Sequence, residues 1–427
     1  MRAAAGVLRL GVGDFARQLT TMRVTGAGSR ASALRWQGRF ATRFLWSLRR
    51  IYAGALDDVG RFPEGPARPL SLTGDVRRLD VPAPEPRWCD GAGRWHAGAT
   101  ARPDGWLRLT RYEGGRRGPV LLAPGFGMPA TSFLTDTVGE NLVEHLTARG
   151  YDVWLFDYRA STDLESSKRA FDMDDVARTD WPAAVAEVLR VTGATSVQVV
   201  AHCAGALTLM MALGAGLTGV RSAVCMQFTL HPVVSAFNLL KIRLGVGPKL
   251  RLLGVQAVHP LVGRSALNTV LDLGLRALPL PTGERCGKAV CRWVNGIYGC
   301  THHHEQLDQA THDKLDDYFG VGHLAPLNHL SEIARRGVAV DRHGVEAYTQ
   351  QPERFRLPIL LVSGDKNIIF RPEGTLRTFR WLRAANDPGY YERIVLPGYS
   401  HLDALIGKTA STDVYPRLSE HLDRFNP

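Results

Sequence analysis

The feature that most constrains the fold is a regular alternation of apolar and amphipathic stretches between residues 106 and 230. The short apolar runs, which have the length and composition of strands, are 119–122, 151–158, 197–201 and 221–230. The amphipathic stretches between them, 136–149 and 174–189, have a helical period, and a further helix is expected over 205–213. Strands that alternate with helices favour a parallel sheet covered by helices.

The alternation stops near residue 232 and resumes near residue 357. Residues 233–355 are mostly helical in pattern and contain no clear strand. The sequence therefore predicts an N-terminal basic segment and linker (1–79), a core interrupted by an insertion, and a helical cap as that insertion. The first part of the core is 80–232, the cap is 233–355, and the second part of the core is 356–427.

The net charge of +11 is concentrated at the N-terminus, where residues 1–50 hold ten Arg and one acid, Asp14. The remaining chain is therefore close to neutral, which does not favour nucleic acid as a partner. The six Cys are too few for a disulfide framework in a chain of 427 residues, and a hydrophobic content of 45% excludes a fully disordered chain.

Residues 31–52 have a basic stripe and an aromatic stripe at helical spacing. Such a helix either lies at a membrane interface or docks on the body of the protein, and both alternatives stay open. Arginines interrupt every N-terminal stretch that could form the apolar core of a secretory signal. The uncharged run 191–220 has the pattern of a strand, a turn and a helix rather than of a membrane span. We therefore expect a cytoplasmic protein, with peripheral membrane contact if residues 31–52 bind lipid.

The chemistry is predicted at the sequence Ala201-His202-Cys203-Ala204-Gly205, which lies between a predicted strand and a predicted helix. A nucleophile on such a sharp turn needs small neighbours, because the backbone is strained and the helix passes close to the sheet. The N-terminus of the following helix would stabilise a thiolate, so we expect a lowered pKa for Cys203.

This pattern resembles the nucleophile elbow Gly-x-Ser-x-Gly of the α/β-hydrolase superfamily, with Ala201 at the first glycine and Cys203 at the serine. It is similar to polyhydroxyalkanoate synthases, whose elbow also carries Cys. It more closely resembles the hydrolase-like domain associated with bacterial cholesterol-oxidase-like flavoproteins, over roughly residues 80–427. The resemblance implies an α/β-hydrolase fold, in which a mostly parallel sheet is flanked by helices and carries a helical cap.

The resemblance also implies roles for the remaining site residues. His401, after the last predicted strand, takes the place of the general base. Asn367 occupies the position of the orienting acid and Asp365 lies two residues before it, so either could hold the His401 ring; an amide oxygen serves this purpose in a Cys-His-Asn set. The backbone N–H groups of Ala204 and Phe126 are expected to form the oxyanion hole.

The expected function is hydrolysis or acyl transfer on lipid-like esters or thioesters, through an acyl-thioester intermediate on Cys203. The cap suggests an apolar acyl or sterol-like substrate, and Arg159 is a candidate substrate-binding residue at the carboxyl edge of the sheet. Two alternatives stay open: a non-catalytic lipid-binding scaffold, and a polymerase like the polyhydroxyalkanoate synthases. We expect no cofactor and no metal, because the Cys and His residues of 286–304 lack a recognised metal-ligand spacing.

Overall fold

The computed structural model describes residues 68–72, 75–82, 88–89, 95–96, 106–252, 254–258, 271–275, 284 and 286–426. The chain divides into two compact units. The smaller unit is Met1–Arg61 with Pro260–Tyr298, and the larger is Phe62–His259 with Gly299–Pro427. The segment predicted at 31–52 lies outside the described residues. Within the described ranges, no helix combines the length and the apolar character that crossing a membrane requires.

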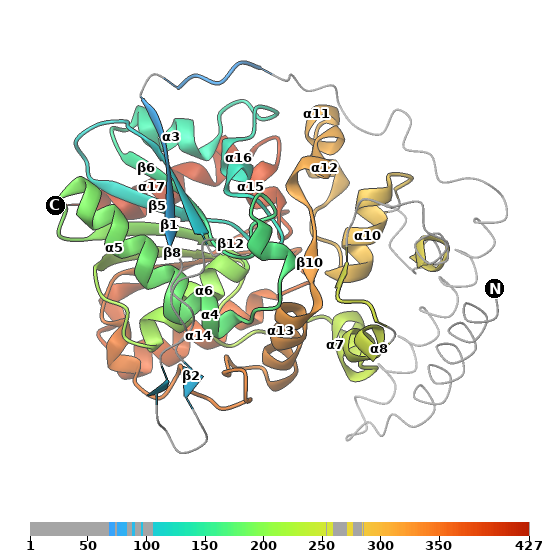
Figure 1. The fold of residues 1–427 in the computed structure, drawn as a ribbon. Coiled ribbons are helices and arrows are strands. Elements are labelled where there is room, and N and C mark those ends of the chain that lie inside the picture. Colours follow the sequence, from blue (N-terminus) through green and yellow to red (C-terminus); the bar gives the residue numbers. More distant parts are fainter. Residues whose placement is uncertain are drawn as a thin grey trace. The chain divides into compact units, whose positions relative to one another are not determined.

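The larger unit is built on an eight-stranded sheet, which Figure 1 shows between layers of helices. Its strand order is β1-β4-β6-β5-β7-β8-β11-β12. These strands are β1 (Val76–Pro82), β4 (Trp106–Tyr112), β5 (Pro119–Ala123), β6 (Asp152–Asp157), β7 (Val197–His202), β8 (Val220–Met226), β11 (Ile359–Gly364) and β12 (Tyr391–Leu396). The pairs β1–β4 and β4–β6 are antiparallel, and every pair from β6 to β12 is parallel. The predicted parallel sheet is confirmed, and β1 adds an edge strand where the sequence indicated only an irregular lead-in. Two-residue strands β2 (Trp88–Cys89) and β3 (Trp95–His96) pair separately.

The order of the strands reverses between β5 and β7. From β5 the chain goes to one side to form β6 and returns to the other side to form β7. In open α/β sheets, ligands bind where the strand order reverses in this way. The loops that follow β5 and β7 therefore meet at a position suited to a binding site.

Helices cover both faces of this sheet. Helices α3 (Leu142–Ala148) and α17 (Tyr415–Arg424) pack together on one face, while α5 (Trp181–Thr192), α6 (Ala204–Gly214) and α14 (Pro372–Ala385) lie on the other (Figure 1). Strands β5, β6 and β7 are buried along their whole length, as expected for strands covered on both faces. Every residue of α6 is also buried, which explains the uncharged run in the sequence.

Two helix boundaries differ from the sequence prediction. The helix predicted from residue 136 begins at Leu142, because Asn141 and Glu144 form a capping box at its start. The helix predicted over 174–189 is three pieces: α4 (Met173–Asp175), a π-helical turn (Val176–Asp180) and α5. Short helices α15 (Asp403–Ile406) and α16 (Ala410–Asp413) precede α17.

The segment between β8 and β11 is largely helical where it is described. The larger unit contains α7 (Ala236–Arg243), α8 (Val246–Leu252), α11 (Gln309–Asp313), α12 (Leu315–Tyr318) and α13 (Leu324–Arg336), and the smaller unit contains α10 (Ala289–Ile297). The expectation of no strand here is wrong: β9 (Ala257–Val258) pairs antiparallel with β10 (Gly322–His323). Two-residue strands are too short to leave an alternating pattern. The boundaries 80–232, 233–355 and 356–427 stay predictions.

Candidate active site

Cys203 lies on a strained turn between β7 and α6, as the elbow motif predicts. Its φ is 53° and its ψ is −122°, an unusual conformation for a residue other than glycine. A methyl group at Gly205 would come within 2.5 Å of Pro124 O and 2.8 Å of Ala123 O. The close passage of α6 beside the end of β5 therefore requires glycine at 205, which is the reason the motif has small residues there.

The loop after β5 brings a second backbone donor to the thiol. The N–H groups of Ala204 and Phe126 both hydrogen-bond to Cys203 Sγ. A methyl group at Gly125 would lie 3.2 Å from Cys203 Cβ, so the loop passes very close to the nucleophile. The structure thus brings together the three groups that the sequence analysis assigned to nucleophile and oxyanion hole.

The electrostatics of the thiol differ from the sequence-based expectation. Burial raises the pKa of Cys203 to about 12, although the Ala204 and Phe126 N–H groups act in the opposite direction. The expectation of a lowered pKa is therefore wrong, because the loss of solvent outweighs the helix N-terminus and the two hydrogen bonds. At neutral pH Cys203 is a thiol rather than a thiolate.

His401 follows β12 and is held through its main chain. The His202 Nε2–H group donates to His401 O at 2.9 Å, and the two rings meet edge to face with centroids 4.9 Å apart. Burial, and then the neighbouring His202, lower the pKa of His401 well below its ordinary value, so its ring is neutral. Within the described chain, Cys203 and His401 are not hydrogen-bonded to each other.

Of the two residues proposed to orient His401, the structure places Asn367 on the ring. Asn367 Nδ2 lies 3.0 Å from His401 Nδ1, whereas Asp365 is exposed and accepts a hydrogen bond from Gly398 N–H. The expected contact by the amide oxygen is wrong. Asn367 Oδ1 instead accepts hydrogen bonds from two main-chain N–H groups just after it, and the amide nitrogen faces the ring.

Gln227 is a site residue that the sequence analysis missed. It follows β8 directly and has a φ of 71°; among described residues other than glycine, only Cys203 shares a positive φ. Its Oε1 accepts hydrogen bonds from Gly364 N–H at 3.1 Å and from Asn367 Nδ2 at 2.9 Å. The available signal was its place: a polar residue at the carboxyl end of the buried strand next to β7.

The surroundings of the His401 ring are aromatic. Phe228 and Phe370 stack with ring centroids 3.7 Å apart, and Phe370 lies 5.8 Å from the His401 ring. On the oxyanion side, Phe126 lies 6.4 Å from Phe171. These rings make the surroundings of His401 and of the Phe126 loop apolar.

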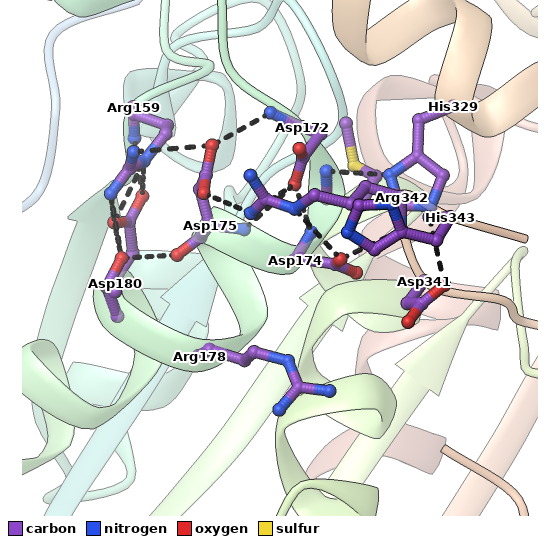
Figure 2. A network of polar contacts seen from close by, with 12 residues as sticks. Arg159, Asp172, Asp174, Asp175, Arg178, Asp180, His329, Asp341, Arg342 and His343 are labelled. Carbon is purple, nitrogen blue, oxygen red and sulfur yellow. Dashed lines mark hydrogen bonds and ion pairs between the residues drawn. The ribbon is translucent and has the colours of Figure 1, made fainter. Parts of the chain in front are cut away.

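Arg159 lies in a buried ionic network instead of contacting the site residues (Figure 2). Its guanidinium hydrogen-bonds to both oxygens of Asp180 and to Thr179. The pKa of Arg159 is raised despite its burial, chiefly by the charge of Asp180. These contacts use its guanidinium, so the substrate-binding role predicted for Arg159 finds no support in this geometry.

The same network contains a group of potential metal ligands, Asp172, Asp174 and His329, whose ligand atoms lie within 4.8 Å of one another. Arg342 forms ion pairs with both carboxylates, and Figure 2 shows its guanidinium beside the Asp side chains. The two nitrogens of the His329 ring bond to Met173 N–H and Val340 O. The charge of Arg342 thus compensates these carboxylates, and the His329 nitrogens already have hydrogen-bond partners.

Comparison with known proteins gives a distant sequence match and shows that solved structures share this fold. No protein-family model matches the chain. The lipase lipl-1 of Caenorhabditis elegans is 27% identical over 146 residues, which cover 32% of this chain and 36% of the lipase. The chain thus spans about a third of the length of this curated relative.

Among solved structures, DcsB in complex with its substrate analogue is similar with a TM-score of 0.50 and 13% identity, covering 82% of this chain and 99% of DcsB. An esterase from Thermogutta terrifontis has a TM-score of 0.46 and 14% identity, covering 82% of this chain and 100% of the esterase. The strand order, the strained turn at Cys203 and the likeness to DcsB together identify the α/β-hydrolase fold.

Proposed function

We propose that the protein is a cysteine-dependent enzyme of acyl transfer that acts on lipid-like esters or thioesters. The observation that carries this proposal is the convergence of two backbone N–H groups, of Ala204 and Phe126, on the strained Cys203 thiol. Two such donors stabilise the negative oxygen that forms when a nucleophile attacks a carbonyl group. The partial likeness to a lipase and the aromatic surroundings of His401 support an apolar substrate.

The reaction begins from a neutral thiol, because burial keeps the pKa of Cys203 near 12. The S–H bond breaks as the S–C bond forms, and His401 Nε2 accepts the proton. The tetrahedral intermediate then collapses: the C–O bond of the ester breaks, and His401 returns the proton to the leaving alcohol. Water or a second alcohol releases the acyl group from Cys203, which makes the enzyme a hydrolase or an acyltransferase.

The hydrogen bond between thiol and imidazole that this step needs is one that the substrate complex has to form. Catalytic hydrogen bonds are often long in free enzymes and shorten when the substrate binds. The His202 bond to the main chain of His401 keeps the ring near the elbow in the meantime.

The test is turnover of a medium-chain nitrophenyl ester by the full-length protein and by Cys203→Ala. We expect turnover in the unchanged protein and none in the variant. Cys225→Ala is the matched control, because the pKa of Cys225 is likewise raised to about 12 but this residue is buried within β8. Equal turnover in Cys203→Ala would show that the thiol is not the nucleophile.

A second function, lipid binding without catalysis, is favoured by one observation: the thiol is protonated and has no hydrogen bond to His401 within the described chain. A scaffold of this kind would bind an apolar ligand and leave Cys203 unmodified. The two proposals differ in the outcome of the same assay, since binding alone gives no turnover with any ester.

A further inference from the structure

The orientation of the Asn367 side chain is determined by its main-chain neighbours. Asn367 Oδ1 is 3.1 Å from both Ile369 N–H and Phe370 N–H. Both groups are donors, so they require an oxygen at this position, and a reversed amide would place two donors against its nitrogen. The Nδ2 group of Asn367 therefore faces His401.

Gln227 fixes the same orientation from the other side. Its Oε1 accepts from Gly364 N–H, a main-chain donor that cannot reverse, so the oxygen of Gln227 also faces Asn367 Nδ2. One hydrogen of Asn367 Nδ2 then goes to Gln227 and the other to His401 Nδ1. Three backbone donors thus set the direction of a chain of two amides that ends on the imidazole.

A nitrogen that accepts a hydrogen bond carries no proton. With Nδ1 of His401 as acceptor, the proton of the neutral ring is on Nε2. We propose that Gln227 and Asn367 are positioning residues that hold His401 in its Nε2-protonated form. In the resting protein, Nε2 then has no lone pair with which to act as a general base. Here this form is called the withheld form.

The inference rests on the proposed function for its consequence, since acyl transfer needs a lone pair at Nε2. In a Ser-His-Asp triad, Asn in place of Asp leaves the geometry intact but lowers turnover about 10⁴-fold, because the ring takes the wrong tautomer. Here that Asn is the natural residue. For His401 to act as a base, its proton has to move to Nδ1 and the Asn367 oxygen has to turn toward it, which breaks the bonds from Ile369 and Phe370.

The tautomer of His401 can be measured without any activity. In the full-length protein labelled with ¹⁵N-histidine, ring nitrogen shifts distinguish a protonated nitrogen from an unprotonated one. The signals of His401, one of 14 histidines, are assigned by their loss in His401→Gln. The withheld form predicts an unprotonated Nδ1 and a protonated Nε2 at neutral pH.

Asn367→Asp tests whether the two amides hold His401 in the withheld form. One carboxylate oxygen keeps the two main-chain bonds, and the other faces His401 Nδ1 as an acceptor. Gln227 Nε2, buried and without a partner in the described chain, can turn toward the new charge only by giving up the bond that Gln227 Oε1 accepts from Gly364 N–H. We expect the ring to become protonated at Nδ1 and turnover to rise about 10²- to 10⁴-fold. Asp365→Asn is the control, because Asp365 is exposed and accepts from Gly398 N–H, so the change leaves the ring in the withheld form.

The outcomes separate this inference from the proposed function. A protonated Nδ1 in the unchanged protein, or a ring that Asn367→Asp does not alter, overturns the role of the two amides. An inverted tautomer with unchanged turnover overturns the claim that this form limits catalysis. The predicted tautomers without Cys203-dependent turnover in either protein support the amide chain and refute the proposed function.

Discussion

Gly205→Ala perturbs the elbow without removing any catalytic group. The added methyl would lie 2.5 Å from Pro124 O and 2.8 Å from Ala123 O, where ordinary contact begins at 3.4 Å. Relief of the shorter contact requires α6 and the end of β5 to separate by about 0.9 Å, since main-chain atoms cannot rotate away. Overpacking of this kind costs about 1–3 kcal/mol, offset by about 0.5–1 kcal/mol from replacing glycine in a helix.

The separation also moves Ala204 N–H relative to Phe126 N–H, and with it the proposed oxyanion hole. Displacement by about 1 Å lowers catalytic rates about 100-fold, so we expect activity to fall far more than stability. Urea unfolding followed by circular dichroism gives the stability, and hydrolysis of a medium-chain nitrophenyl ester, scaled to folded protein, gives the activity. Gly139→Ala is the control, because nothing lies within 4 Å of its added methyl. Full activity in Gly205→Ala would refute the reasoning.

Three further predictions concern the surrounding residues. Arg159→Ala leaves the carboxylate of Asp180, whose side chain is 0% exposed, without its cation and should cost about 3–5 kcal/mol of stability with KM unchanged; a selective rise in KM would restore the substrate-binding role. The pKa of Asp172 is raised to about 6, mainly by burial and then by its acidic neighbours, so its contribution to stability is present below pH 4 and is lost as the pH rises through 6. Asp172→Asn should therefore reduce the difference in unfolding free energy between pH 5 and pH 7.5, and an unchanged difference would contradict this. His202→Leu leaves the buried His401 carbonyl without its donor and should cost about 1–3 kcal/mol and lower kcat rather than raise KM, as thermal melts and steady-state kinetics would show.

The sheet and the elbow were predictable because local sequence determines them. Buried strands give continuous apolar runs, and the strand-turn-helix at Cys203 requires small residues within five positions. The edge strand β1 was missed because its sequence, VRRLDVP, contains three charged residues and lacks the continuous apolar run of a buried strand. Its position depends on pairing with β4, which is not encoded within seven residues.

The candidate site was predictable in its residues and less so in its chemistry. Chain order placed Asn367 beside His401, but which end of the amide faces the ring depends on main-chain donors that only the folded loop provides. The thiol pKa depends on burial, which a motif does not report. Gln227 was missed for the same reason, since its role arises from its contact with a residue 140 positions away.

The measurement that tests the central claim most directly is mass spectrometry of the protein after brief incubation with an activated medium-chain ester or an acyl-CoA. The account predicts one added acyl group, released by hydroxylamine, on the peptide that contains Cys203, and none on Cys225, which burial also keeps protonated with a pKa of about 12. Turnover of the substrate while Cys203 stays unmodified, or an equal acyl signal in Cys203→Ala, would contradict it.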